Sequence, residues 1–143
     1  MVWLEKLGTQ TALITKWTDK DAKKGVTYKY TVRAVKSSSK SSYKSTGELM
    51  YLAQPTVTVA SVNNGVSVEW SRSTGATGYI VYRSEYNTKT KKWSGWKNLG
   101  TQTALITKWT DKDAKKGVTY KYTVRATNGD YKSSYVASKN VKR

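Results

Sequence analysis

A 28-residue stretch, LGTQTALITKWTDKDAKKGVTYKYTVRA, is present twice in this chain without a single change. The first copy runs from Leu7 to Ala34 and the second from Leu99 to Ala126, an offset of 92 residues. Such an offset is too long for the unit of a solenoid and close to the length of a small all-β domain. Because the chain has 143 residues, the repeat predicts one complete domain and about half of another.

Each copy has the residue pattern of β-strands separated by a polar loop. In the first copy, apolar residues alternate with threonine and basic residues from Val26 to Ala34, which predicts a half-buried strand. Thr11–Trp17 is rich in β-branched and aromatic residues and predicts an earlier strand. Thr18–Gly25 is polar and ends in glycine, so we expect a loop there. Residues 1–6 are predicted to be the end of a strand that leads into this copy.

A single proline marks the boundary between the two parts of the chain. Pro55 follows a segment, 48–53, that is predicted to be extended. Proline favours a linker or the start of an edge strand at such a position. We therefore place the boundary at Leu52–Pro55 and divide the chain into residues 1–53 and residues 54–143.

The second part has the strand spacing of a β-sandwich. From Thr56 onward, seven short strands are predicted at intervals of about 8–12 residues, with turn residues between them. The last of these strands is predicted from Tyr131 to Val141. We expect one hydrophobic core between two sheets.

Four segments of residues 54–143 carry a family resemblance. They are GVSVEW, GATGYIVYR, KWTD and GVTYKYTVRA, and in this order they resemble a fibronectin type III module, of the kind found in tandem on surface and secreted proteins of Gram-positive bacteria. The resemblance implies an all-β, fibronectin-III or immunoglobulin-like antiparallel β-sandwich of seven strands. It covers residues 1–53 only as the C-terminal half of a second module, so we expect an extra half-sandwich.

The resemblance also implies which side chains form the core. Tyr120 would be the tyrosine of the corner before the sixth strand, with its hydroxyl hydrogen-bonded back to the chain. Ala114 lies six residues upstream as its apolar partner, and Tyr28 and Ala22 are the same pair in the first copy. The complete set of expected core residues is Trp70, Tyr79, Val81, Trp109, Tyr120, Tyr122 and Val124.

Residues 1–53 have no counterpart of the first three strands, Thr56–Tyr86. We expect the downstream copy of the repeat to complete these strands, because a permuted arrangement would have to close through the short segment Leu52–Pro55. The upstream copy then keeps open edges and an apolar face, which invite pairing with a second copy of the chain. The expected assembly is a homo-oligomer, a domain-swapped dimer or an open fibre. The residues expected on this self-association face are Trp17, Tyr28, Tyr30 and Val32.

The extra half has two alternative origins. The chain could be a window from a longer array, with the missing strands located before residue 1. The identity of the two copies could also indicate a designed or duplicated-segment protein with no natural function.

The composition argues against catalysis and metal binding. The chain has no His and no Cys, which removes the usual metal ligands, general base and thiolate nucleophile. The triplets Asp19–Asp21 and Asp111–Asp113 have too few oxygen ligands and too many neighbouring lysines for a calcium loop, so we expect solvated turns. Glu69 is predicted to face solvent rather than to form a catalytic pair with Glu85. We expect no enzyme activity, no metal and no cofactor.

The chain is strongly basic, with 26 Lys and Arg against 9 Asp and Glu and a net charge of +17. Each copy of the repeat carries six bases and two acids, so the charge is spread rather than clustered. Binding of an anionic cell-wall polymer or glycan stays open. Nucleic-acid binding is not expected, because most aromatic residues fall on inward positions. Trp93 and Trp96 could contact a partner, although packing is the preferred interpretation.

The N-terminal segment MVWLEKLG lacks the basic and apolar regions of a signal peptide. No apolar stretch approaches the roughly 20 residues that a membrane-spanning helix needs. The resemblance implies an extracellular or bacterial cell-surface location. We expect a non-enzymatic structural, spacer or adhesion module that associates with itself, or alternatively a binding module for an anionic polymer.

Overall fold

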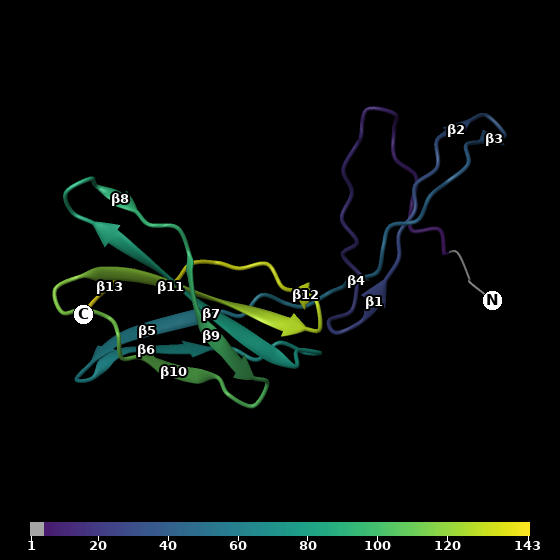
Figure 1. The fold of residues 1–143 in the computed structure, drawn as a ribbon. Helices are drawn as coiled ribbons and strands as arrows, with labels where there is room; N and C mark the ends of the chain where they lie inside the picture. The colour runs from purple at the N-terminus through teal and green to yellow at the C-terminus, as the bar shows by residue number, and fades with distance from the viewer. Residues whose placement is uncertain (1–4) are drawn as a thin grey trace.

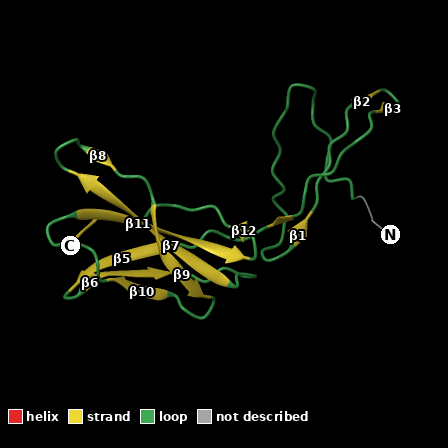
Figure 2. Cartoon of the chain, in the orientation of Figure 1, coloured by secondary structure: helices red, strands yellow, loops and turns green. Residues whose placement is uncertain are grey.

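The computed structural model describes residues 5–143, and the regular elements in this range are all β-strands (Figure 2). No helix long and apolar enough to cross a membrane is present among these residues. The strand expected at residues 1–6 lies largely outside the described range, and Glu5 and Lys6 are not in a strand. The strands before residue 54 are β1 (Thr27–Tyr28), β2 (Val35–Lys36), β3 (Ser39–Lys40) and β4 (Leu49–Met50). The later strands are β5 (Val57–Val62), β6 (Gly65–Trp70), β7 (Gly78–Asn87), β8 (Lys92–Trp93), β9 (Lys97–Thr103), β10 (Lys108–Asp111), β11 (Thr119–Asn128), β12 (Tyr131–Lys132) and β13 (Val141–Lys142).

The strands from β5 to β13 form the two sheets of a β-sandwich (Figure 1). One sheet has the order β10-β6-β5. In the other, β7 lies between β11 and β9, and both β12 and β13 pair with β11. Every one of these pairings is antiparallel. If β12 and β13 are taken as one interrupted strand and the short β8 is set aside, the expected seven-stranded sandwich is confirmed.

The expected last strand, Tyr131–Val141, is interrupted, and β12 and β13 cover only its two ends. Between them, the Tyr122 N–H donates to the Ser138 hydroxyl at 3.0 Å. The Thr123 hydroxyl donates to the Val136 carbonyl at 2.9 Å. Side-chain hydroxyls therefore occupy positions that backbone groups would take in a regular ladder.

Alternation along the strands places the apolar side chains between the two sheets. A fully buried valine or aromatic side chain contributes about 1.5–3 kcal/mol relative to an exposed one, so this layer is the main source of stability. Its buried members are Leu52, Val66, Val68, Trp70, Tyr79, Val81, Ala114, Tyr120, Tyr122, Val124, Ala126 and Val141.

The first copy of the repeat forms far less strand than the second. The strand predicted at Thr11–Trp17 is wrong, because this segment contains no strand, and of the strand predicted at Val26–Ala34 only β1 is present. The corresponding residues of the second copy contribute to β9, β10 and β11. There, β10 pairs with β6 and β11 pairs with β7. A strand needs such a neighbour for its backbone hydrogen bonds, and in the first copy only β1 has one, the two-residue strand β4.

Residues 5–53 extend away from the sandwich as a hairpin with long loops (Figure 1). β1 pairs with β4 near the sandwich, and β2 pairs with β3 at the far end of the hairpin. Among the described residues, ten of the fourteen exposed large hydrophobic side chains lie in this part of the chain, which therefore has no enclosed core of its own.

The segment that joins the two parts is built into the sandwich. Leu52 and Pro55 are buried. The Ser73 hydroxyl donates to the Ala53 carbonyl at 2.8 Å, and the Ser134 hydroxyl lies 3.0 Å from the Gln54 side-chain oxygen. The segment is therefore a packed connection rather than a free tether.

Candidate functional site

The two copies of the 28-residue repeat lie in different environments. The contrast is clearest at a buried polar cluster in the second copy. Asp111 ends β10 and is only 1% exposed. The Tyr122 hydroxyl donates to its Oδ2 at 2.8 Å, and the Arg83 guanidinium donates to the same oxygen at 2.8 Å. The Asp113 N–H donates to Oδ1 at 3.1 Å. A buried carboxylate is stable only with such partners.

The prediction of a solvated turn is therefore wrong for Asp111. The motif itself carries no indication of burial, because the identical triplet Asp19–Asp21 lies near the surface in the first copy. Arg83 makes the difference. Its residue type could have drawn attention to it, since it is a basic residue in the strand pattern GYIVYR.

The cluster also changes the ionisation of its members. Burial raises the pKa of Tyr122, and its hydrogen bond to Asp111 raises that pKa further. Burial lowers the pKa of Arg83, but the hydrogen bond and charge of Asp111 outweigh this effect and leave the Arg83 pKa above its ordinary value. Near neutral pH Arg83 therefore keeps its charge, and Tyr122 stays neutral and donates to the Asp111 carboxylate.

The first copy reproduces this cluster without the arginine. The Tyr30 hydroxyl donates to Asp19 Oδ2 at 2.9 Å, and the Asp21 N–H donates to Asp19 Oδ1 at 3.0 Å. Desolvation and the bond to Asp19 raise the pKa of Tyr30. Among residues 5–143 no Lys or Arg forms an ion pair with Asp19. Its carboxylate is half-buried and lacks the cation that its counterpart has.

The tyrosine corner is present in both copies. The Lys115 N–H donates to the Tyr120 hydroxyl at 2.8 Å, and the Lys23 N–H donates to the Tyr28 hydroxyl at 2.7 Å. The apolar partner of Tyr120, Ala114, is buried. This feature depends only on contacts within the repeat, so it forms whether or not the sandwich is complete.

The residues expected in the core are buried with one exception. Trp70 and Tyr79 pack with ring centroids 5.7 Å apart. Trp109 is half-buried and packs at the edge of the core, because it lies on β10 at the edge of its sheet. The fully buried members of the expected set are Trp70, Tyr79, Val81, Tyr120, Tyr122 and Val124.

The residues expected on the self-association face are only partly exposed. Val32 is 87% exposed, whereas its counterpart Val124 is fully buried, and Trp17 is 46% exposed. Tyr28 and Tyr30 are half-buried rather than open, because they stack on each other at 5.9 Å and their hydroxyls are hydrogen-bonded. The face therefore consists of an exposed valine and tryptophan beside two ordered tyrosines.

A second contact of interest joins the two parts of the chain. Gly25 ends the loop of the first copy with φ +78°, and Gly75 lies in the β6–β7 turn with φ +80°. A Cβ placed on Gly75 would lie 2.5 Å from the Gly25 Cα, so Gly75 has no room for a side chain, and a Cβ on Gly25 would lie at a tight 3.2 Å from the Gly75 Cα. Gly117, the counterpart of Gly25, has the same φ of +78° and nothing within 4 Å of a Cβ.

A shallow hollow lies near the tip of β7 and collects basic and aromatic groups. Its volume is about 320 Å³, and it contains Arg83, Lys92, Trp93 and Lys97 in its lining. Trp93 is half-buried against the Tyr86 ring at 5.2 Å, with the Lys121 ammonium 4.3 Å from its ring centre. These contacts hold the Trp93 ring in place at the wall of the hollow.

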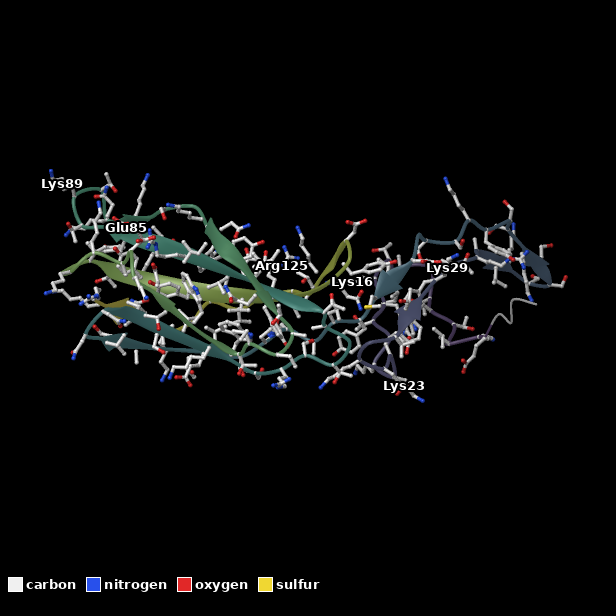
Figure 3. All side chains as sticks on the ribbon, turned by 60° about the horizontal axis from the view of Figure 1, so that its bottom comes forward. Lys16, Lys23, Lys29, Glu85, Lys89 and Arg125 are labelled. Atoms are coloured by element: carbon white, nitrogen blue, oxygen red, sulfur yellow. The ribbon has the colours of Figure 1, made fainter. Side chains whose placement is uncertain are left out.

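Charged side chains lie along the whole molecule. Figure 3 shows Lys89 and Glu85 near one end, Arg125 in the middle, and Lys23 and Lys29 beyond the junction. Glu69 is exposed and pairs with Lys108 at 2.8 Å. Within residues 5–143, no three metal-binding side chains come together.

Comparisons with solved structures bear on the fold. A twitchin kinase region from C. elegans, described as Fn31-NL-kin-CRD-Ig26, matches with a TM-score of 0.51 and 16% identity, over 64% of this chain and 16% of that one. Domains A168–A170 of titin match with a TM-score of 0.50 and 21% identity, over 85% of this chain and 42% of that one. The fold is that of a fibronectin type III-like β-sandwich.

A fibronectin-III-like protein from Clostridium thermocellum has a TM-score of 0.48 and 22% identity, over 63% of this chain and 88% of that chain. No known family profile and no characterised protein matches the sequence. Identities of this size establish the fold alone.

Proposed function

We propose that this chain is a non-enzymatic spacer or adhesion module of an extracellular or cell-surface protein, and that it associates with itself through residues 5–53. One observation carries the proposal. Identical residues are buried in the second copy of the repeat and open to solvent in the first, with Val124 fully buried and Val32 87% exposed. An apolar face of this kind is a site for a protein partner.

The junction supports the spacer role. The packed segment from Leu52 to Pro55 and the contact between Gly25 and Gly75 hold the two parts end to end, and the described chain is elongated (Figure 1). The buried carboxylate of Asp111 serves a structural pair rather than a reaction. These features suit a spacer, which holds its two ends and its loops at fixed positions relative to one another.

Light scattering after size-exclusion chromatography tests the self-association. The protein is expected to have a mass above its 16.1 kDa monomer, and the excess should grow with salt because screening reduces the repulsion between chains of charge +17. Val32→Ser should lower the apparent mass. Val136→Ser is the matched control, because Val136 is an exposed valine on the sandwich. A monomer under all these conditions contradicts the proposal.

A second candidate function is binding of an anionic cell-wall polymer or glycan. The observation that favours it is the hollow beside Trp93, with Lys92 and Lys97 in its lining. Binding of an anionic polysaccharide to immobilised protein should weaken steeply as salt rises, which is opposite to the salt effect on self-association. Lys92→Ala with Lys97→Ala should weaken it further, and an unchanged affinity contradicts this candidate.

A further inference from the structure

We propose that the open face of residues 5–53 accepts the strands β5, β6 and β7 of a second copy of the chain, in the register that the second repeat already uses. The inference rests on the proposed self-association and names the partner segment. In this arrangement the upstream half of one molecule takes the place of residues 99–143 in another. Arg83 of the second copy would then pair with Asp19.

Sequence identity defines the complementary surface. In the sandwich, β11 pairs with β7 so that Val124 lies opposite Val81 and Tyr122 opposite Arg83. The first copy has the same residues at the same spacing. Val32 would therefore lie opposite Val81 of the second copy, with no change in side-chain shape.

Charge complementarity selects the same partner. Asp19 is held by Tyr30 and by the Asp21 N–H in the geometry that Asp111 has in the sandwich. The group that Asp19 lacks is the guanidinium supplied by Arg83 to Asp111. A strand with an arginine at this position would complete the cluster, whereas a second upstream half has no counterpart of Arg83 to offer.

The hairpin of the upstream half, from Tyr30 to Thr46, already has the side-chain hydrogen bonds that the sandwich uses. The Tyr30 N–H donates to the Thr46 hydroxyl at 2.9 Å, as the Tyr122 N–H donates to the Ser138 hydroxyl at 3.0 Å. Further matching bonds join Arg33 to Ser41 and Arg125 to Ser133, each at 2.7 Å. Because this hairpin is preformed, the additional ordering on docking falls mainly on residues 7–17, which form no strand in the first copy.

The number of available strands limits the fraction of molecules that can be exchanged. Each chain has one β5–β7 set and two halves that fit it, so an incoming half displaces the resident one and leaves it open. The exchange is therefore nearly balanced in free energy, and the resident half is favoured by its attachment, which acts as a local concentration of the order of millimolar. Exchanged molecules should become common only when chains are refolded together at high concentration.

Engineered disulfides test the register, because the native chain has no cysteine. Chains carrying Val32→Cys are unfolded, mixed with chains carrying Val81→Cys, refolded together and oxidised. We expect a disulfide between the two chains, with a yield that rises at least tenfold between about 0.01 and 1 mM protein. Val124→Cys with Val81→Cys in one chain is the positive control. Thr31→Cys with Val81→Cys is the negative control, since alternate residues face opposite sides of a strand.

Two asparagine variants test the charge pairing. Asp19→Asn in the Val32→Cys chain should lower the yield several-fold. Asp111→Asn in the Val81→Cys chain should raise it, because it weakens only the resident half. If that second chain does not refold, the effect of Asp19→Asn alone decides the role of the pairing.

Each outcome separates the exchange from self-association in general. Disulfides that join two Val32→Cys chains to each other, in place of the mixed pair, overturn the exchange and leave self-association in place. A yield equal to that of the Thr31→Cys control overturns it as well. A monomeric native protein in light scattering contradicts the proposed self-association of the native chain, whereas the exchange is decided by the disulfide yield after joint refolding.

Discussion

Arg83 on β7 and Asp111 at the end of β10 lie 2.8 Å apart inside the protein and join its two sheets. The Arg83 guanidinium also lies 5.0 Å from the centre of the Tyr120 ring. The pair spans the layer that the two sheets enclose, so it forms only when strands from both parts of the module are in place. Asp19, with the same local sequence, has no such partner among the described residues.

The first prediction concerns this pair. Asp111→Asn should lower the free energy of unfolding by about 3–5 kcal/mol, because it leaves the Arg83 charge buried without its counter-ion. Asp19→Asn, the same change in the same local sequence, should lower it by less than about 1 kcal/mol. Urea unfolding followed by tryptophan fluorescence measures both. Equal effects of the two variants would show that the ion pair contributes nothing to the sandwich.

The second prediction concerns alkaline pH. The pKa of Tyr122 is raised in the folded state above the ordinary value of 10.0. As pH rises past 10, the unfolded chain loses this proton while the folded one keeps it, so the contribution is complete below pH 10 and is lost above it. Native stability should fall above pH 10 more steeply than that of Tyr122→Phe, by up to about 1.4 kcal/mol per pH unit.

Urea unfolding at several pH values between 9 and 11 checks this difference. Lysine deprotonation affects both proteins alike and cancels in the comparison. Tyr30→Phe is the matched control, since Tyr30 lies outside the sandwich. Parallel pH curves for the native protein and Tyr122→Phe would contradict the assigned pKa direction.

The third prediction compares two valines with identical neighbours in sequence. Val124→Ala should destabilise the sandwich by about 2–3 kcal/mol, through lost burial and the cavity left behind. Val32→Ala should change the stability of the sandwich by less than about 0.5 kcal/mol. Thermal unfolding of both variants at low protein concentration measures the difference. A large loss for Val32→Ala would show that Val32 already packs against the sandwich.

The fourth prediction concerns the junction. Gly75→Ala and Gly117→Ala both place a side chain at positive φ, which costs about 1–2 kcal/mol in either case. Only the Gly75 variant also forces the Gly25 loop away. It should therefore change the orientation of residues 5–53 relative to the sandwich, as measured by residual dipolar couplings. An orientation unchanged from that of Gly117→Ala would show that the close glycine contact does not set the junction.

Prediction from sequence succeeded where a structural feature depends on neighbouring residues or on a strictly periodic pattern. The alternation in GVSVEW, GYIVYR and GVTYKYTVRA was sufficient to predict these strands of the sandwich, and the family resemblance of the same segments implied most of its core. Trp109, which the resemblance placed in the core, packs against the core but stays half-buried because it lies at a sheet edge. Prediction failed for Asp111, because burial of a charge depends on a cation from a distant strand. Neither the position of a strand at a sheet edge nor a charged partner on a distant strand can be recognised from the neighbouring residues in the sequence.

The repeat shows what the sequence by itself determines. Both copies form the tyrosine corner, the aspartate–tyrosine bond and the serine-bonded hairpin, at nearly the same distances. These contacts join residues close along the chain or across one hairpin, so the same residues produce them in either environment. Tertiary structure decided the rest. Only the second copy lies against β6 and β7, and these strands supply the backbone partners, the apolar cover and the guanidinium that turn the same residues into two sheets with a core.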